Sequence, residues 1–190
     1  MTAGKGGSLV LLILLLSLPL LRAGLMWGAG LELHFDEAQY WEWSRQLDWS
    51  YYSKGPLVAW LIALSETLFG DGAWQVRLFG WLAYSGFLAL LFYFAQDVWH
   101  SRAAAWWALL LGLTTPLFFS LGSVMTTDVV LLLLWTWGMW ALFRALFQTQ
   151  PLAWYEFGAA VGLAGLTKLS VVLLPLFSGM WLLLTPTGRQ

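Results

Sequence analysis

Long apolar stretches alternate with short polar ones along most of this chain. A helix that crosses a bilayer needs about 20 mainly apolar residues, and the apolar stretches reach or approach that length. We therefore predict an all-α fold: a polytopic helical bundle of about six membrane spans, in a single domain over residues 1–190. The predicted spans are residues 9–27, 75–95, 103–122, 129–147, 153–167 and 170–184.

Proline and polar residues mark the boundaries of the later spans. Pro116 is expected to kink the span over 103–122. The polar residues 148–151, which end in proline, predict a turn. As one helix, the last apolar stretch (153–184) would be about 48 Å long at about 1.5 Å per residue, too long for one crossing. Lys168 lies near its middle, so we predict two shorter helices that meet there.

The first apolar run has the position of a signal peptide, close to the N-terminal Met. It continues to about Trp27 without a small-residue cleavage pattern, so we predict an uncleaved first span.

Residues 29–74 interrupt the apolar pattern with a polar and aromatic loop. Within it, residues 56–69 are apolar but short, which favours a helix lying at the membrane surface over a crossing one. Another surface helix is predicted to begin at Glu37, with Asp36 as its N-cap and Gln39 completing a capping box. The loop is therefore expected to hold two interfacial helices joined by a turn.

The composition agrees with a membrane protein. Hydrophobic residues make up 60% of the chain and charged residues only 10%, whereas soluble domains carry about 25% charged residues. The 15 Trp fit this location, because aromatic side chains collect at membrane interfaces. A net charge of −1 gives no footprint for nucleic acid. The absence of Cys excludes disulfides, thiolate metal ligands and a Cys nucleophile.

Alternation of the spans places three polar segments on one face of the membrane. They are the 29–74 loop, the break at residues 123–128 and the turn at Lys168. The basic residues divide evenly between the two faces, so the positive-inside rule does not decide which face this is. The charged groups are nevertheless expected to converge on one side of the bundle.

Asp36 and Glu37 are the first candidates for chemistry on that side. A structural reading is that Asp36 only caps a helix. The two roles are compatible, because a carboxylate at a helix N-terminus is held rigidly and is stabilised by the helix dipole. A rigidly held carboxylate can act as a general base.

Three cations complete the candidate site: Lys54, Arg77 and Lys168. A charged residue at membrane depth costs about 2.5–3.5 kcal/mol, so Arg77 and Lys168 each need a partner. A phosphate would serve, since Arg offers it a bidentate fork. Lys168 could instead pair with Asp128, which could also be a helix N-cap. Lys54 could hold an anion beside the helix that starts near Pro56, or simply extend to water.

Other catalytic patterns are missing from the sequence. His34 is interpreted as a surface residue, and no Ser/His/Asp order, phosphate loop or convincing metal-ligand cluster is present. No cofactor is assigned. A divalent cation is conceivable, but no residue pattern supports one.

The order of several short motifs resembles glycosyltransferase family 39, which contains the protein O-mannosyltransferases and is related to the aminoarabinose transferases that modify lipid A. The resemblance covers about residues 36–175, and its strength lies in the order and spacing of the motifs. The matching residues are Asp36-Glu37-Ala38, Tyr40-Trp41, Tyr51-Tyr52-Ser53-Lys54, Pro56-Leu57, Phe69-Gly70-Asp71, Val76-Arg77-Leu78, Thr127-Asp128 and Gly165-Leu166-Thr167-Lys168.

The resemblance implies an integral membrane transferase of the GT-C fold, in the cytoplasmic (inner) membrane with its active loop on the periplasmic side. Such enzymes move a sugar from a polyprenyl-phosphate carrier to a lipid or protein acceptor. By this analogy Asp36 is the base and Glu37 orients acceptor or donor. The resemblance makes the following residues candidates for binding substrate or the lipid phosphate: Lys54, Arg77, Lys168, Tyr52 and Asp128.

Two departures from the family pattern stand out. Many relatives have two prolines after the lysine, where this chain has Gly55-Pro56, and some have an acidic residue at the position of Ser53. Members usually run to several hundred residues, so we expect this chain to be the N-terminal part of a longer protein. Two other functions stay open: a non-enzymatic carrier or flippase subunit for lipid phosphates, and a small solute transporter.

Overall fold

The computed structural model describes residues 3–185, and every regular element within that range is a helix. The ends of the predicted domain, residues 1–2 and 186–190, lie outside the described residues. The elements in chain order are α1 (Ala3–Ala29), α2 (Phe35–Ser44), α3 (Leu57–Phe69), α4 (Ala73–Trp99), α5 (Arg102–Thr114), α6 (Pro116–Leu121), α7 (Thr127–Phe147), α8 (Leu152–Gly165), the 3₁₀ helix η1 (Leu169–Val172) and α9 (Leu173–Leu184). The all-α prediction is therefore confirmed over these residues.

Three of these helices are long and apolar enough to cross a membrane: Leu9–Ala29 within α1, then α4 and α7. The other predicted spans correspond to shorter elements, namely α5 with α6, α8, and η1 with α9. The predicted total of six spans therefore stays a prediction.

The helix breaks fall where proline and polar residues predicted them. Thr115 has an extended conformation between α5 and α6, because the residue before a proline avoids the helical region. The turn at residues 148–151 contains Thr149 at a φ of 52°. Lys168, also extended, separates α8 from η1 and α9, so the predicted break of the last apolar stretch is confirmed.

The start of α2 differs from the prediction. The helix begins at Phe35 and its N-cap is His34, whose Nδ1 accepts a hydrogen bond from the Asp36 backbone N–H. Glu37 closes the capping box by accepting from the His34 backbone N–H at 2.9 Å. The prediction that Asp36 caps a helix starting at Glu37, with Gln39 as its partner, is wrong. The cap lies two residues earlier because the Glu37 side chain is the one that turns back.

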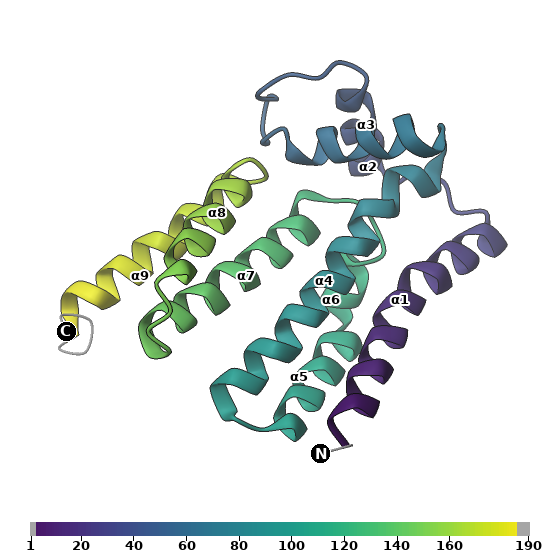
Figure 1. Cartoon of the computed structure of the whole chain (residues 1–190). Coiled ribbons are helices and arrows are strands. Elements are labelled where there is room, and N and C mark those ends of the chain that lie inside the picture. Colours follow the sequence, from purple (N-terminus) through teal and green to yellow (C-terminus); the bar gives the residue numbers. More distant parts are fainter. Residues whose placement is uncertain (1–2, 186–190) are drawn as a thin grey trace.

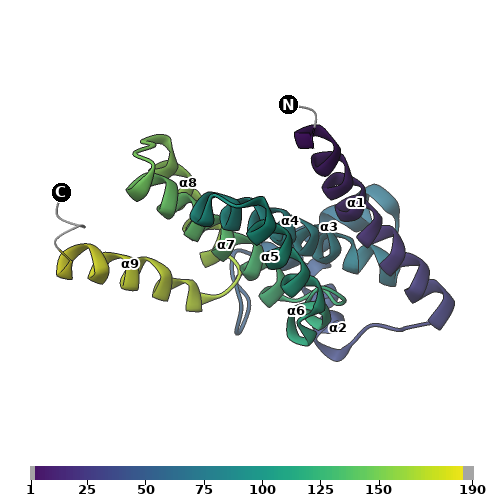
Figure 2. The same ribbon diagram turned by 90° about the horizontal axis from the view of Figure 1, so that it is seen from below.

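Helix α4 is the centre of the bundle, in contact with α1, α3, α5 and α7, while α8 packs on α7. Its Tyr84 is fully buried and donates a hydrogen bond to the Gly112 carbonyl of α5 at 2.9 Å. Helices α2 and α3 lie across one end of the bundle (Figure 1). Seen along the bundle, α9 projects away from the other helices and α1 lies at the opposite edge (Figure 2).

Candidate functional site

The three polar segments predicted to share one face meet at the end of the bundle covered by α2 and α3. Two backbone hydrogen bonds join the loop before α3 to the end of α8: Gly55 N–H to the Thr167 carbonyl at 3.2 Å, and Leu57 N–H to the Leu166 carbonyl at 3.0 Å. A Cβ at Gly55 would overlap the Leu166 carbonyl oxygen. Glycine in place of the family's first proline therefore allows this close backbone approach.

Glu37 is fully buried and connects three parts of the site. Its carboxylate accepts from Arg77 Nε at 2.8 Å and Nη2 at 2.6 Å, and from the Met125 backbone N–H at 2.9 Å. Together with the bond from His34, these contacts tie α2 to α4 and to the break between α6 and α7. A buried carboxylate with this many donors holds its helix in one position.

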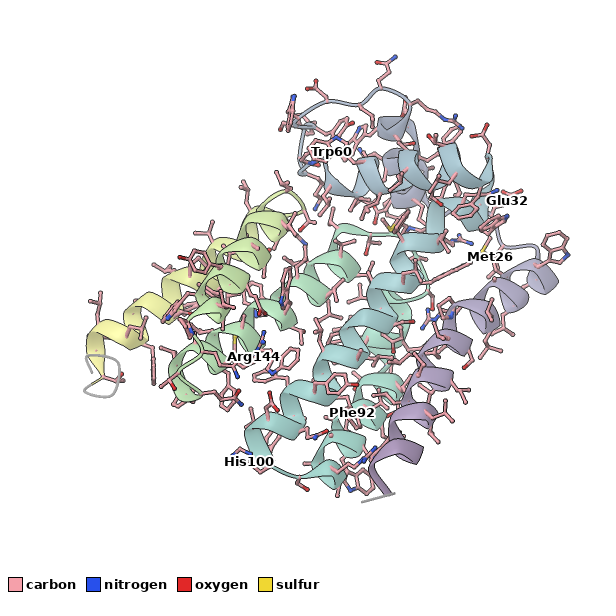
Figure 3. All side chains as sticks on the ribbon, viewed as in Figure 1. Met26, Glu32, Trp60, Phe92, His100 and Arg144 are labelled. Carbon is pink, nitrogen blue, oxygen red and sulfur yellow. The ribbon has the colours of Figure 1, made fainter. Side chains whose placement is uncertain are left out.

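Arg77 is as fully occupied as its partner. Besides Glu37, its Nη1 donates to the Leu31 carbonyl at 3.3 Å and its Nη2 to the Glu32 carbonyl at 2.6 Å. Glu32 lies in the linker between α1 and α2, close to the start of α4 (Figure 3). Arg77 would have to leave these partners to bind a phosphate. In this structure it therefore holds helices together and is not available to a ligand.

Asp36 contrasts with its neighbour. Its side chain is half-buried, and its carboxylate makes no hydrogen bond or ion pair within residues 3–185. The Asp36 carboxylate lies near enough to Tyr40, one turn further along α2, for its charge to act on the phenol. Burial is the main cause that raises the pKa of Tyr40; the Thr127 hydroxyl opposes this shift, and the charges of Asp36 and Asp128 add to it. Tyr40 therefore keeps its proton at neutral pH, and two carboxylates flank it.

Asp128 is paired with a lysine from another helix break. Lys168 Nζ lies 2.7 Å from Asp128 Oδ1, and both side chains are partly exposed. Of the two partners considered for Lys168, a phosphate or Asp128, the structure shows Asp128. Asp128 is not an N-cap, because the Thr126 side chain caps α7. The pair brings the break at 123–128 and the turn at Lys168 into contact.

Lys54 makes no side-chain hydrogen bond or ion pair with the described part of the chain. It lines a cavity of about 460 Å³ together with Lys168, Trp49 and Tyr52. Two of the three predicted phosphate cations therefore share one cavity, and the third, Arg77, lies outside it. Tyr52 at the rim is fully exposed.

Sequence reasoning missed several contributors to this site. They are the cap His34, the backbone N–H of Met125 and the buried phenol of Tyr40. One signal was present: Arg77 was expected to need a partner, and Glu37 was one of the carboxylates on the same face. Among residues 3–185, no group of three or more His, Cys, Asp or Glu is placed to hold a metal ion.

The fold and this site define a helical membrane protein in which two charged groups that are unpaired in the described chain, Asp36 and Lys54, lie at one end of the bundle. The chain belongs to the dolichyl-phosphate-mannose-protein mannosyltransferase family, whose sequence pattern matches residues 53–190. This family assignment confirms the resemblance noted from the motifs.

Individual relatives agree with that assignment. Lipid A galacturonosyltransferase RgtD of Rhizobium johnstonii is 32% identical over 180 residues, covering 94% of this chain and 38% of the relative. Undecaprenyl phosphate-alpha-4-amino-4-deoxy-L-arabinose arabinosyl transferase 2 of Proteus mirabilis is 34% identical over 150 residues, covering 70% of this chain and 27% of the relative. The chain thus spans well under half the length of either relative.

A solved structure shows the same fold. ArnT from Cupriavidus metallidurans, in the apo state, matches with a TM-score of 0.76 at 21% identity. The match covers 96% of this chain and 37% of that one.

Proposed function

We propose that this chain carries the acceptor-activating part of a membrane glycosyltransferase. The carrying observation is the contrast between two adjacent carboxylates: Glu37 is buried and fully bonded, whereas Asp36 is half-buried and without a partner within residues 3–185. A general base must be free to take a proton, and it must be held in place. Asp36 is free, and Glu37 holds it in place by anchoring the start of α2.

The donor is a sugar linked to a polyprenyl phosphate, and the acceptor is a lipid or protein carrying a hydroxyl or phosphate. Two relatives support this choice, since their names specify lipid A and an undecaprenyl-phosphate-linked sugar. We place the reaction on the outer face of the cytoplasmic membrane. The site lies at the end of the bundle covered by α2 and α3, two helices that are not among the three candidate spans, and we propose that this end faces outward.

In the proposed reaction Asp36 takes the acceptor proton while the acceptor oxygen bonds to the anomeric carbon. The bond from that carbon to the carrier's phosphate oxygen breaks, and its electron pair leaves with the phosphate. A single displacement of this kind inverts the anomeric carbon. Lys54 faces the shared cavity without a partner and stabilises the charge that develops on the phosphate.

Lys168 and Tyr52 line the same cavity and are proposed to contact the donor. Asp128 holds Lys168 at the cavity until a phosphate arrives. Glu37 and Arg77 are proposed to act by positioning α2 rather than by touching either substrate.

The test is the Asp36→Asn substitution in the full-length protein, assayed with a polyprenyl-phosphate-linked sugar. Asn is isosteric with Asp and cannot take the proton, so transfer should fall by about 10²–10⁴-fold. Glu42→Gln is the matched control, because Glu42 is an exposed carboxylate on the same helix. Full activity of Asp36→Asn would refute the base assignment. Binding of polyprenyl phosphate without any sugar transfer by the unsubstituted protein would favour a non-enzymatic carrier.

A further inference from the structure

Arg22 is a buried cation inside the membrane span of α1. Its Nη1 donates to Ser123 Oγ at 2.8 Å and its Nη2 to the Phe119 carbonyl at 3.4 Å. The guanidinium also lies over the rings of Tyr84 and Phe119, at 4.6 Å and 5.0 Å from their centroids. None of these partners is an acid, and Arg22 makes no ion pair within residues 3–185.

An apolar cavity of about 230 Å³ adjoins this guanidinium. It lies between α1, the start of α4 and the α6–α7 break, and its polar groups include two arginines and no carboxylate. The charge of Arg77 is balanced by Glu37, whereas that of Arg22 is not. The cavity therefore carries one uncompensated positive charge at membrane depth, where an anionic partner is strongly favoured.

The mouth of this cavity faces the surroundings of the bundle. Leu25 lines the cavity and is 61% exposed, and α1 lies at one edge of the molecule in both views (Figures 1 and 2). Ser123, which holds the guanidinium, belongs to the break at the α2–α3 end of the span. The charge thus lies toward the α2–α3 end of a helix whose outer side is exposed in the described chain.

We propose that this cavity binds the phosphate head group of an anionic membrane phospholipid. The guanidinium pairs with the phosphodiester as a planar donor fork, and the acyl chains follow the exposed apolar side of α1. The charge of the cavity selects an anion, and its apolar walls select an anion attached to hydrocarbon. This site is separate from the one that contains Asp36 and Lys54, and the proposal does not depend on the transfer reaction.

The experiment uses the full-length protein, stripped of lipid in detergent and titrated with dioleoyl phosphatidylglycerol under native mass spectrometry. We expect Arg22→Gln to weaken lipid binding by about tenfold or more, the range of a lost charged hydrogen bond. Arg22→Lys should retain part of the affinity. Arg45→Gln is the matched control, since Arg45 lies on the α2–α3 surface and pairs with Asp71. Dioleoylglycerol, which lacks the phosphate, should bind weakly to every variant.

A second variant separates lipid binding from the anchoring of α1. Leu25→Trp narrows the cavity mouth and leaves the contacts of Arg22 to Ser123 in place, so it should lose phosphatidylglycerol while keeping its melting temperature in lipid-free detergent. Unchanged lipid binding by Leu25→Trp, or by a folded Arg22→Gln protein, would overturn the proposal. Displacement of the lipid by equimolar inorganic phosphate, or preferential binding of undecaprenyl phosphate, would overturn the assignment to a phospholipid.

Discussion

The two ends of the bundle use charged residues differently. The α2–α3 end holds a buried Glu37–Arg77 pair and two charges that have no partner in the described chain, Asp36 and Lys54. At the other end, where Figure 3 labels His100 and Arg144, the charges are tied to neighbouring helices. Arg144 of α7 pairs with Glu156 of α8. The charged residues at the far end serve to join helices. At the α2–α3 end some charged residues join helices and others stay without a partner in the described chain.

The opposite end shows how a membrane bundle satisfies charges that only hold it together. Asp97 of α4 accepts from Trp140 Nε1 at 2.8 Å, and Arg144 lies over the same indole at 4.3 Å. Helices α4, α7 and α8 are therefore linked by one connected set of side chains. The lesson of the comparison is that unsatisfied charge, rather than charge itself, marks the end where chemistry is proposed.

The largest effect is expected from Glu37→Gln. It leaves the buried Arg77 guanidinium with its charge uncompensated, and breaking a buried pair in this way costs about 3–5 kcal/mol. Thermal unfolding in detergent should therefore show a strongly lowered melting temperature. The double variant Glu37→Gln/Arg77→Met should be less destabilised than the two single losses combined. A melting temperature equal to that of the unsubstituted protein would show that the pair does not hold α2.

A smaller loss is expected from Gly55→Ala. The new Cβ would overlap the Leu166 carbonyl and push the loop away from the Lys168 turn, at a cost of about 1–3 kcal/mol for an overpacked contact. Hydrogen exchange at the Leu57 amide should become faster, because its bond to Leu166 is lost. Gly28→Ala is the control, since Gly28 lies in a helix with nothing near its Cβ position. Unchanged protection of Leu57 would contradict the close approach.

At the other end, Glu156→Gln should cost only about 1 kcal/mol, because the pair with Arg144 is partly exposed and solvent screens it. Transfer activity measured beside stability should fall no more than the folded fraction does. A large, selective loss of transfer would show that the two ends are coupled and that charges at the opposite end also serve the reaction.

The smallest change in stability is expected from Asp36→Asn. Asp36 has no partner within residues 3–185, so unfolding should shift by less than about 0.5 kcal/mol, as for surface substitutions. Adjacent carboxylates should then give opposite results, with Glu37 controlling stability and Asp36 controlling transfer. Strong destabilisation by Asp36→Asn would remove that distinction.

Most of the fold could be predicted because the length of a helix and the place where it breaks depend on residues that are close together in the sequence. The breaks at Pro116, at residues 148–151 and at Lys168 each follow from residues at the break itself. The convergence of polar segments followed from counting crossings. The Asp128–Lys168 contact, between residues 40 positions apart, agrees with that convergence.

The centre of the site could not be predicted in the same way. Glu37 reaches Arg77 across 40 residues and the Met125 N–H across 88, and no local spacing encodes such partners. The capping error has the same origin. Asp36 suits an N-cap better than His34 by residue type, but the cap falls at His34 because Glu37 turns back to it while also bonding the distant Arg77.

The join between Gly55 and Thr167 has a consequence for how this protein could change specificity. It consists of main-chain groups, so it constrains the identity of few side chains beyond Gly55 itself. Tyr52 of the same loop is fully exposed and can therefore be exchanged without shifting the backbone that carries Lys54. A loop grafted from a relative therefore has to keep that glycine to preserve the two main-chain hydrogen bonds to the end of α8.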